Sequence, residues 1–133
     1  MTTSEPEPRE AASLRRQVRA FLAEAGSGGV SDGWVRSWDG FDADLSRELG
    51  RRGWVGMTLP RAYGGGERSA LERHAVIEEL LAAGAPVAAH WIADRQFGPL
   101  VNRLGTDLQK RRWLPPLCRG ELCVAIGLSE PEA

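Results

Sequence analysis

The 133-residue sequence has few of the features that tie a protein to a membrane, a metal or a nucleic acid. Its apolar runs stay well short of the roughly 18 residues that a transmembrane helix needs, so no membrane span is predicted. Seventeen basic residues face eighteen acidic ones. Nucleic-acid-binding domains normally carry a strongly basic surface, so no nucleic-acid partner is predicted. The two histidines, His74 and His90, lie far apart without a third ligand at metal spacing, which argues against a zinc site.

Cysteine is equally scarce, with only Cys118 and Cys123. Residues 1–8 are polar and acidic, without the apolar stretch of a secretory signal. We therefore expect a cytoplasmic protein whose two thiols are reduced and of the buried type. Hydrophobic residues make up 42% and charged residues 26% of the chain, as in an ordinary globular domain. One domain of this length buries roughly two-thirds of the surface of its unfolded chain.

What the sequence does contain is repeated helical periodicity. Apolar residues from Leu14 to Ala25 recur at helical spacing and predict a first helix from Arg9, which Gly26–Gly29 ends. A second helix is predicted from about Asp42 to Arg52 and a third from about Ser69 to Ala83. Between the first two, residues 30–40 carry Trp34 and Trp38 and are expected to lie irregularly over the core. Residues 54–60 are expected to form a buried extended connection, and residues 63–66 a turn.

The second half of the chain continues this pattern. A fourth helix is predicted from about Pro86 to Leu104, with a kink or break near Ala93–Arg95 because Pro99 removes a backbone hydrogen bond. A fifth begins with Thr106 as N-cap and reaches about Leu114, after which Pro115 and Pro116 could open a further helical turn. Residues 122–128 are β-branched and apolar. The fold class is therefore mainly α, with five or six helices and one short C-terminal strand.

The sequence offers no recognisable catalytic centre. The glycines after Tyr63 lack the Gly-Lys-Ser/Thr that a phosphate-binding loop requires, so a structural turn is the better interpretation. Glu78 and Glu79 show no sign of a convergent acid–base pair and are expected to be solvated or salt-bridged. No nucleophile has a base and orienting group that can be placed beside it. We therefore predict neither a catalytic residue nor a metal ligand in this chain.

A modest basic cluster lies near the C-terminal end of the helical region. It consists of Lys110, Arg111 and Arg112 together with Arg103 and Arg119. Cations at a helix end are favoured by the helix dipole, so a solvated helix terminus is the simpler interpretation. Weak contact with an anion or a partner is the alternative.

Several short motifs occur in an order that resembles the acyl-CoA dehydrogenases. The segment from Gly53 to Pro60 and the Tyr63-Gly-Gly-Gly66 turn are similar to that family's Gly-hydrophobic-x-Gly-x-x-x-Pro-x-x-Tyr-Gly-Gly. They are followed in register by Glu78-Glu79-Leu80, Gly98-Pro99-Leu100, Gly105-Thr106, Gln109-Lys110, Leu114-Pro-Pro-Leu117, Gly120-Glu121 and Ser129-Glu130-Pro131. The resemblance implies a lead-in at 1–8, expected to be disordered, the family's N-terminal helical domain at 9–120, and the start of its middle β-domain at 121–133.

That resemblance also implies a function. Members oxidise an acyl-CoA thioester to its 2,3-enoyl form with FAD, pass electrons to an electron-transfer flavoprotein, and assemble as homo- or hetero-oligomers of dehydrogenase subunits. By correspondence, Ile126, Leu128 and Ser129 would face the flavin, although Ser129 could simply serve the turn before Pro131. Ile92 and Gln96 would border the acyl tail. The family's catalytic glutamate falls beyond Ala133, and Glu132 stands where the family often has glycine.

Two hypotheses follow from this resemblance. In the first, the chain is the N-terminal portion of an FAD-dependent acyl-CoA dehydrogenase. In the second, it is a truncated, non-catalytic homologue that docks on a partner dehydrogenase subunit.

Overall fold

The structure, a computed structural model, describes residues 7–24, 40–127 and 130, and within these ranges it contains helices and no strand. The helices are α1 (Arg9–Glu24), α2 (Ala43–Arg51), α3 (Ala70–Ala82), α4 (Ala88–Ile92), α5 (Gly98–Leu104) and α6 (Asp107–Cys118). A 3₁₀ turn, η1 (Arg61–Tyr63), precedes α3, and a π-helical turn, η2 (Ala93–Phe97), joins α4 to α5. The mainly helical fold predicted from the apolar periodicity is confirmed.

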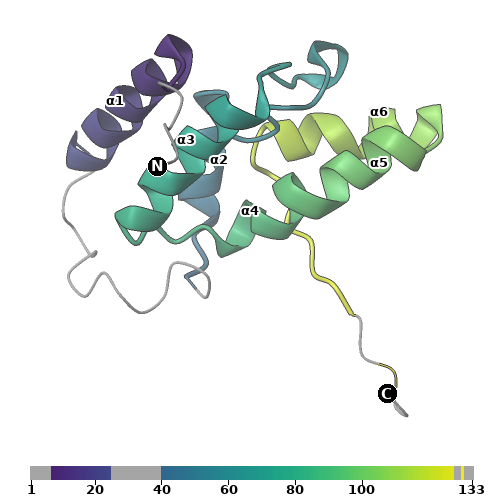
Figure 1. Cartoon of the computed structure of the whole chain (residues 1–133). Coiled ribbons are helices and arrows are strands. Elements are labelled where there is room, and N and C mark those ends of the chain that lie inside the picture. The colour runs from purple at the N-terminus through teal and green to yellow at the C-terminus, as the bar shows by residue number, and fades with distance from the viewer. Residues whose placement is uncertain (1–6, 25–39, 128–129, 131–133) are drawn as a thin grey trace.

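α1 packs along α3, and α5 and α6 form an antiparallel hairpin at the other end of the molecule (Figure 1). The apolar stripe of α1 contributes Leu14, Val18 and Phe21 to the core, where Val76 and Leu80 of α3 also lie. The connection after α2 is buried in this core, as expected, but it is not extended: it folds through turns, in one of which the N–H of Leu59 donates to the carbonyl of Gly56. Its buried side chains include Trp54, Val55, Met57 and Leu59. This connection thus joins the α1–α3 pair to the α5–α6 hairpin.

Helix starts follow the local capping chemistry. Ser69 caps α3 and Thr106 caps α6, each in a capping box with the residue three positions later, Glu72 or Gln109. α4 begins at Ala88 rather than near Pro86, because Val87 forms an antiparallel bridge with Phe41 and the N–H of Ala88 donates to the carbonyl of Gly40. These bonds hold residues 86–87 outside the helix.

Three expectations need correction or qualification. α6 continues past Leu114 to Cys118, so the further turn that Pro115 and Pro116 could open is part of the same helix. The carbonyls that lose their partners belong to Arg111 and Arg112, which are exposed, so water can replace the missing bonds. Cys118 is buried as expected, whereas Cys123 is exposed. Residues 121–127 form no strand, since no described segment pairs with them; Leu128 lies outside the described residues, as do residues 30–39.

None of the helices in the described ranges is long and apolar enough to cross a bilayer.

Candidate functional site

The most unusual backbone in the described chain is the π-helical turn η2, which lies within one continuous helix from α4 to α5. Its defining bond runs from the N–H of Gly98 to the carbonyl of Ala93. In a regular α-helix the ring of Pro99 would clash with the carbonyl of Arg95, and that carbonyl would lose its donor. A wider turn directly before Pro99 relieves the clash. Where the sequence predicted a kink or break near Ala93–Arg95, the structure has a π-turn, and the helix continues through it.

Gly98 holds this helix close to its neighbours. A Cβ added there would lie 2.9 Å from Leu117 Cδ1 of α6 and 3.2 Å from Leu59 Cδ1 of the buried connection. Contacts this short leave no room for a side chain. The glycine therefore lets the π-turn sit directly against the core, which fixes the direction of the opposite, outer face.

The π-turn aligns an outer stripe along this helix. In an uninterrupted α-helix, Leu100 would lie roughly 80° around the axis from Ile92, because each residue turns the chain by about 100°. A π-turn holds one residue more than an α-turn, which brings Leu100 back to within roughly 20° of Ile92. Gln96 falls between them. Ile92 is half-buried, Gln96 is exposed and Leu100 is 57% exposed, so the stripe is mostly apolar and accessible.

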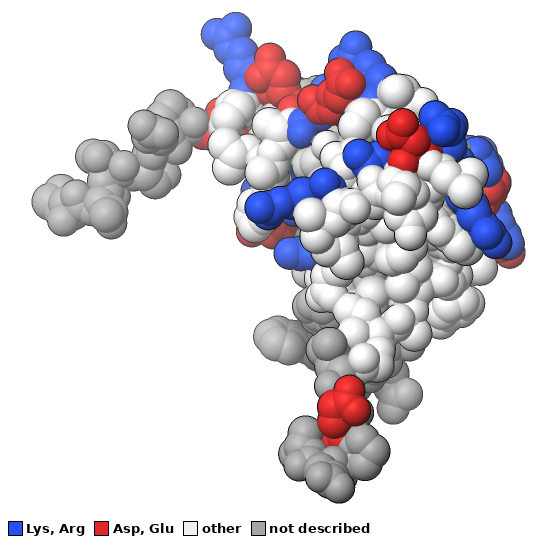
Figure 2. Space-filling view, turned by 90° about the vertical axis from the view of Figure 1, so that its right-hand side faces the viewer, with Lys and Arg blue, Asp and Glu red and all other residues white. Residues whose placement is uncertain are grey.

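The distribution of charge leaves one large uncharged face on the molecule. In Figure 2 the Lys, Arg, Asp and Glu side chains gather over the upper part of the view, while the part below them, toward the C-terminal extension, is uncharged. The exposed large hydrophobic residues of the described chain are Phe41, Leu71, Leu100, Leu104, Leu108 and Ile126. Most of them follow α4 in sequence. The second half of the chain therefore carries most of the accessible apolar surface.

The residues predicted to face the flavin lie in the C-terminal extension. Leu122 and Val124 pack against the core and alternate with the exposed Cys123 and Ala125, which fits extended backbone; Ile126 departs from this alternation and is exposed. Ile126 is 44% exposed. Leu128 and Ser129 lie outside the described residues. The extension leads away from the helical body (Figure 1), and Ile126 does not come together with Ile92 and Gln96 in one site. The cofactor-binding role of Ile126 stays a prediction.

Asp94 is a buried residue that sequence reasoning missed. It lies in the π-turn, and its Oδ1 accepts a hydrogen bond of 2.6 Å from the N–H of Gly56. Burial raises the pKa of this carboxyl above its ordinary value. The bond ties the inner side of the π-turn to the connection between α2 and η1. No local sequence signal marks it, because the two residues are 38 positions apart.

Ser46 and His90 form a second buried polar pair, with 2.7 Å between Ser46 Oγ and His90 Nδ1. The Ser46 hydroxyl donates to the carbonyl of Asp42, so Nδ1–H donates to Ser46 Oγ. This arrangement is opposite to that of a base activating a nucleophile. Burial lowers the pKa of His90 to about 4, so the ring is neutral at physiological pH. Burial likewise raises the pKa of the Cys118 thiol to about 11, so that group is not a reactive thiolate. The pair therefore stabilises the contact between α2 and α4.

The glutamates of α3 act as the sequence indicated. Arg19 donates to both oxygens of Glu79 at 2.7 and 2.8 Å, and Arg15 bridges Glu79 and Glu78. The hydrogen bonds from Arg19 hold the pKa of Glu79 below its ordinary value, which makes it a poor proton acceptor. These ion pairs join α1 to α3. No cluster of three potential metal ligands occurs among the described residues.

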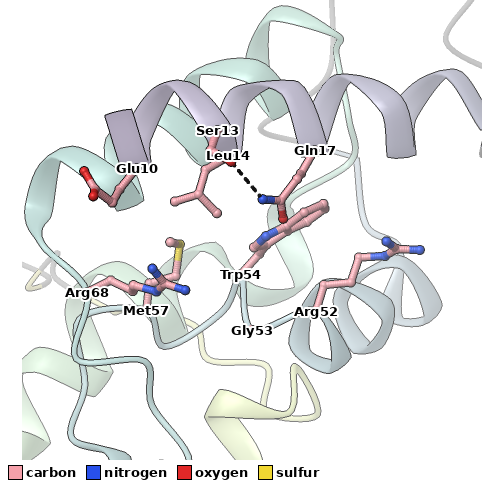
Figure 3. Close-up of a pocket in the computed structure, with 9 residues that line it drawn as sticks. All are labelled: Glu10, Ser13, Leu14, Gln17, Arg52, Gly53, Trp54, Met57 and Arg68. Atoms are coloured by element: carbon pink, nitrogen blue, oxygen red, sulfur yellow. Dashed lines mark hydrogen bonds between the residues drawn. The ribbon is translucent and has the colours of Figure 1, made fainter. Parts of the chain in front are cut away.

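A small cavity of about 210 Å³ opens between α1 and the connection after α2 (Figure 3). Leu14, Trp54 and Met57 form its apolar walls, and Gln17 donates to Ser13 along its edge at 3.4 Å. The Arg68 side chain lies beside Met57 but is paired with Glu72. None of the predicted site residues contributes to this cavity.

These features define a helical domain with an accessible apolar stripe on its outer face and structural roles for its buried polar groups. Residues 8–121 match the acyl-CoA dehydrogenase N-terminal domain, and the chain belongs to this family. It is 34% identical over 131 residues to acyl-CoA dehydrogenase FadE12 of Mycobacterium tuberculosis, covering 98% of this chain and 33% of that protein. It is 40% identical over 86 residues to FadE26 of the same organism, covering 65% of this chain and 21% of FadE26.

Solved structures show the same relationship. The ChsE4–ChsE5 complex from Mycobacterium tuberculosis has a TM-score of 0.78 and 32% identity, covering 100% of this chain and 33% of the chain it matches. The Tcur3481–Tcur3483 steroid ACAD also has a TM-score of 0.78, with 29% identity, covering 96% of this chain and 33% of the other. The chain therefore spans about a third of the length of these relatives.

Proposed function

We propose that this chain is the N-terminal portion of an FAD-dependent acyl-CoA dehydrogenase, an oxidoreductase that converts an acyl-CoA thioester to the 2,3-enoyl-CoA. The observation that carries the proposal is the family match over residues 8–121, in the N-terminal third of relatives that are dehydrogenases. Residues 9–120 would form the helical domain and residues 121–133 the start of the middle β-domain.

The outer stripe of α4, η2 and α5 supplies the acyl-facing surface in this proposal. Ile92 presents an apolar side chain next to the exposed amide of Gln96, and the π-turn keeps Leu100 in line with both. An apolar chain laid along the stripe would bury these side chains and exclude water from its own surface. The Gln96 amide would be the point on the stripe at which a polar group of the bound molecule could form a hydrogen bond. The stripe thus acts by binding and orienting the tail, with no part in bond breaking.

The C-terminal extension would supply this chain's share of the flavin site. Bound FAD supplies the chemistry of hydride acceptance, which no side chain of this protein can replace. Residues 122–127 are extended and pair with no described backbone group, so their N–H groups are free for a sheet or a ligand. We propose that residues 122–128 become a strand of the middle domain. Ile126, Leu128 and Ser129 would then hold donors toward the flavin ring, where negative charge develops on reduction.

Two kinds of partner follow from this assignment. Electron-transfer flavoprotein would take up the electrons, and other dehydrogenase subunits would complete the oligomer. The similar solved structures are complexes of two different chains, which supports a hetero-oligomer. One is described as a steroid ACAD, so a steroid side-chain CoA thioester belongs beside fatty acyl-CoA thioesters among the substrates to test. The second candidate function is a non-catalytic homologue that docks on a partner dehydrogenase. It is supported by the same two-chain complexes.

A domain-complementation experiment tests the proposal. The chain alone should neither retain yellow FAD through gel filtration nor reduce an electron-accepting dye with any acyl-CoA. Two or three hydrogen bonds of about 1 kcal/mol each would not offset the several kcal/mol that association costs. A chimera that joins this chain to the middle and C-terminal domains of FadE12 should bind FAD and bleach the dye.

The stripe provides the matched control within that chimera. Ile92→Asp should raise KM for long-chain substrates with little change in FAD content, whereas Leu71→Asp, on the exposed face of α3, should leave both unchanged. A chimera that binds FAD but never turns over would favour the docking homologue instead. Dye bleaching by the isolated chain would show that the other domains are not required.

A further inference from the structure

The turn between α5 and α6 carries exposed leucines and arginines together, a surface that the proposed dehydrogenase function does not use. Leu104 and Leu108, each 72% exposed, lie on either side of this turn. Arg103 adjoins Leu104, while Arg111 and Arg112 follow Leu108 at spacings of three and four residues. Such spacings place them on the same side of α6 as Leu108. We call these five residues the leucine–arginine corner.

The cations of this corner are free to meet an external anion. Most arginines elsewhere in the described chain lie in ion pairs, as Arg15, Arg47 and Arg68 do. None of the three corner arginines pairs with a described carboxylate, and Arg112 only stacks on Trp113, 4.6 Å from the ring centroid. Asp107 is the one acidic residue between the two leucines. The local balance is therefore positive, although the whole chain carries a net charge of −1.

The position of the corner makes it a projection. The α5–α6 turn lies at the far right of the view in Figure 1, away from both termini. Leu114, Leu117 and Cys118 bury the C-terminal part of α6 in the core, whereas the five corner residues at and before Arg112 are all exposed. An apolar tip with cations set around it can enter an interface without any other part of the molecule moving.

We propose that the leucine–arginine corner is a peripheral attachment site for an anionic lipid surface. Its leucines would enter the boundary between headgroups and acyl chains, and its arginines would meet lipid phosphates. A second copy is a poor occupant, since matching corners would bring six arginines together. A protein partner is also less suitable, because a stable protein interface takes about 20–30 residues from each side, whereas the corner has five.

The test uses the full chain and vesicles of defined composition. Co-sedimentation should show binding to phosphatidylcholine vesicles that contain roughly 30 mol% phosphatidylglycerol and no binding to phosphatidylcholine alone. Binding to the anionic vesicles should be lost as the salt concentration rises. The double variant Arg111→Gln/Arg112→Gln should weaken binding by about tenfold or more, since each cation contributes roughly fivefold. Leu104→Ser/Leu108→Ser should weaken it by about tenfold.

Matched variants separate the corner from general charge and apolarity. Arg47→Gln/Arg51→Gln removes the same charge from exposed positions of α2, and Leu71→Ser removes an exposed leucine from α3; neither should change binding. Equal loss in the α2 variant, or no preference for anionic vesicles, would overturn the proposal. Retention on immobilised polyglutamate without vesicle binding would instead assign the corner to an acidic protein. Far-UV circular dichroism checks that each variant is folded.

Discussion

At the scale of single residues, backbone conformation and close packing decide which positions accept a change. Gly53 and Gly56 are three positions apart and both have positive φ, 71° and 68°. A Cβ on Gly53 would meet nothing within 4 Å, whereas one on Gly56 would lie 2.5 Å from Cys118 Sγ. The two glycines therefore separate the cost of a left-handed backbone from the cost of a steric clash.

We predict that Gly56→Ala destabilises the fold far more than Gly53→Ala. The Gly53 variant should lose about 1 kcal/mol, the usual cost of a left-handed non-glycine residue. The Gly56 variant should lose roughly 3 kcal/mol or more, because the buried connection must also move away from α6. Urea unfolding followed by tryptophan fluorescence measures both. Equal losses would show that Cys118 has room to shift.

At the scale of elements, the bond from Gly56 to Asp94 links two segments that neighbouring residues alone would not bring together. It anchors the π-turn, and with it the orientation of Ile92 and Gln96. Burial raises the pKa of Asp94 in the folded protein above its ordinary value of 3.8, so the folded state favours the protonated acid. Ionisation of Asp94 therefore opposes folding as pH rises above 3.8 and until it passes the raised pKa of the folded protein.

We predict that Asp94→Asn is at least as stable as the parent chain at pH 8 and loses this advantage as the pH falls toward 4. The amide oxygen still accepts from Gly56 N–H, while the cost of a buried charge is gone. Asp94→Ala should instead lose about 1–3 kcal/mol at every pH, because the buried N–H of Gly56 keeps no partner. Thermal unfolding across this pH range measures the difference. An Asn variant less stable than the parent chain at pH 8 would mean that the carboxylate is stabilised by groups other than Gly56.

At the scale of the whole molecule, accessible apolar surface gathers on the α5–α6 hairpin and the C-terminal extension. Residues 122–127 have extended backbone that pairs with no described segment, and such an edge can act as a template for another chain. The solved relatives matched by this chain are about three times as long as it is.

We predict that the isolated chain self-associates at micromolar concentration, in part through this extension. Ala125→Pro should lower the associated fraction by removing one N–H from the exposed edge, while Ala125→Ser should not. Light-scattering chromatography over a concentration series measures the mass. A monomer at all concentrations, without binding of a hydrophobic dye, would contradict the prediction.

The sequence by itself determined the elements whose causes are local. The apolar stripe of α1, the capping residues Ser69 and Thr106, and the irregular turn before Pro99 all depend on residues within a few positions of one another. The ordered motifs from Gly53 to Pro131 indicated the family, and the match over residues 8–121 confirms it. The role of Ile92 and Gln96 in binding the acyl tail was indicated by resemblance and stays a prediction.

Only the tertiary structure decided the features that depend on distant partners. The Asp94–Gly56 bond, the Ser46–His90 pair and the burial of Glu79 between two arginines join residues 38, 44 and about 60 positions apart. No periodic pattern records such pairings, because their energy depends on how helices dock rather than on local propensity. The C-terminal extension also depends on a distant partner. Its apolar, β-branched residues favour a strand, but a strand needs a neighbouring strand to pair with, and the described residues provide none.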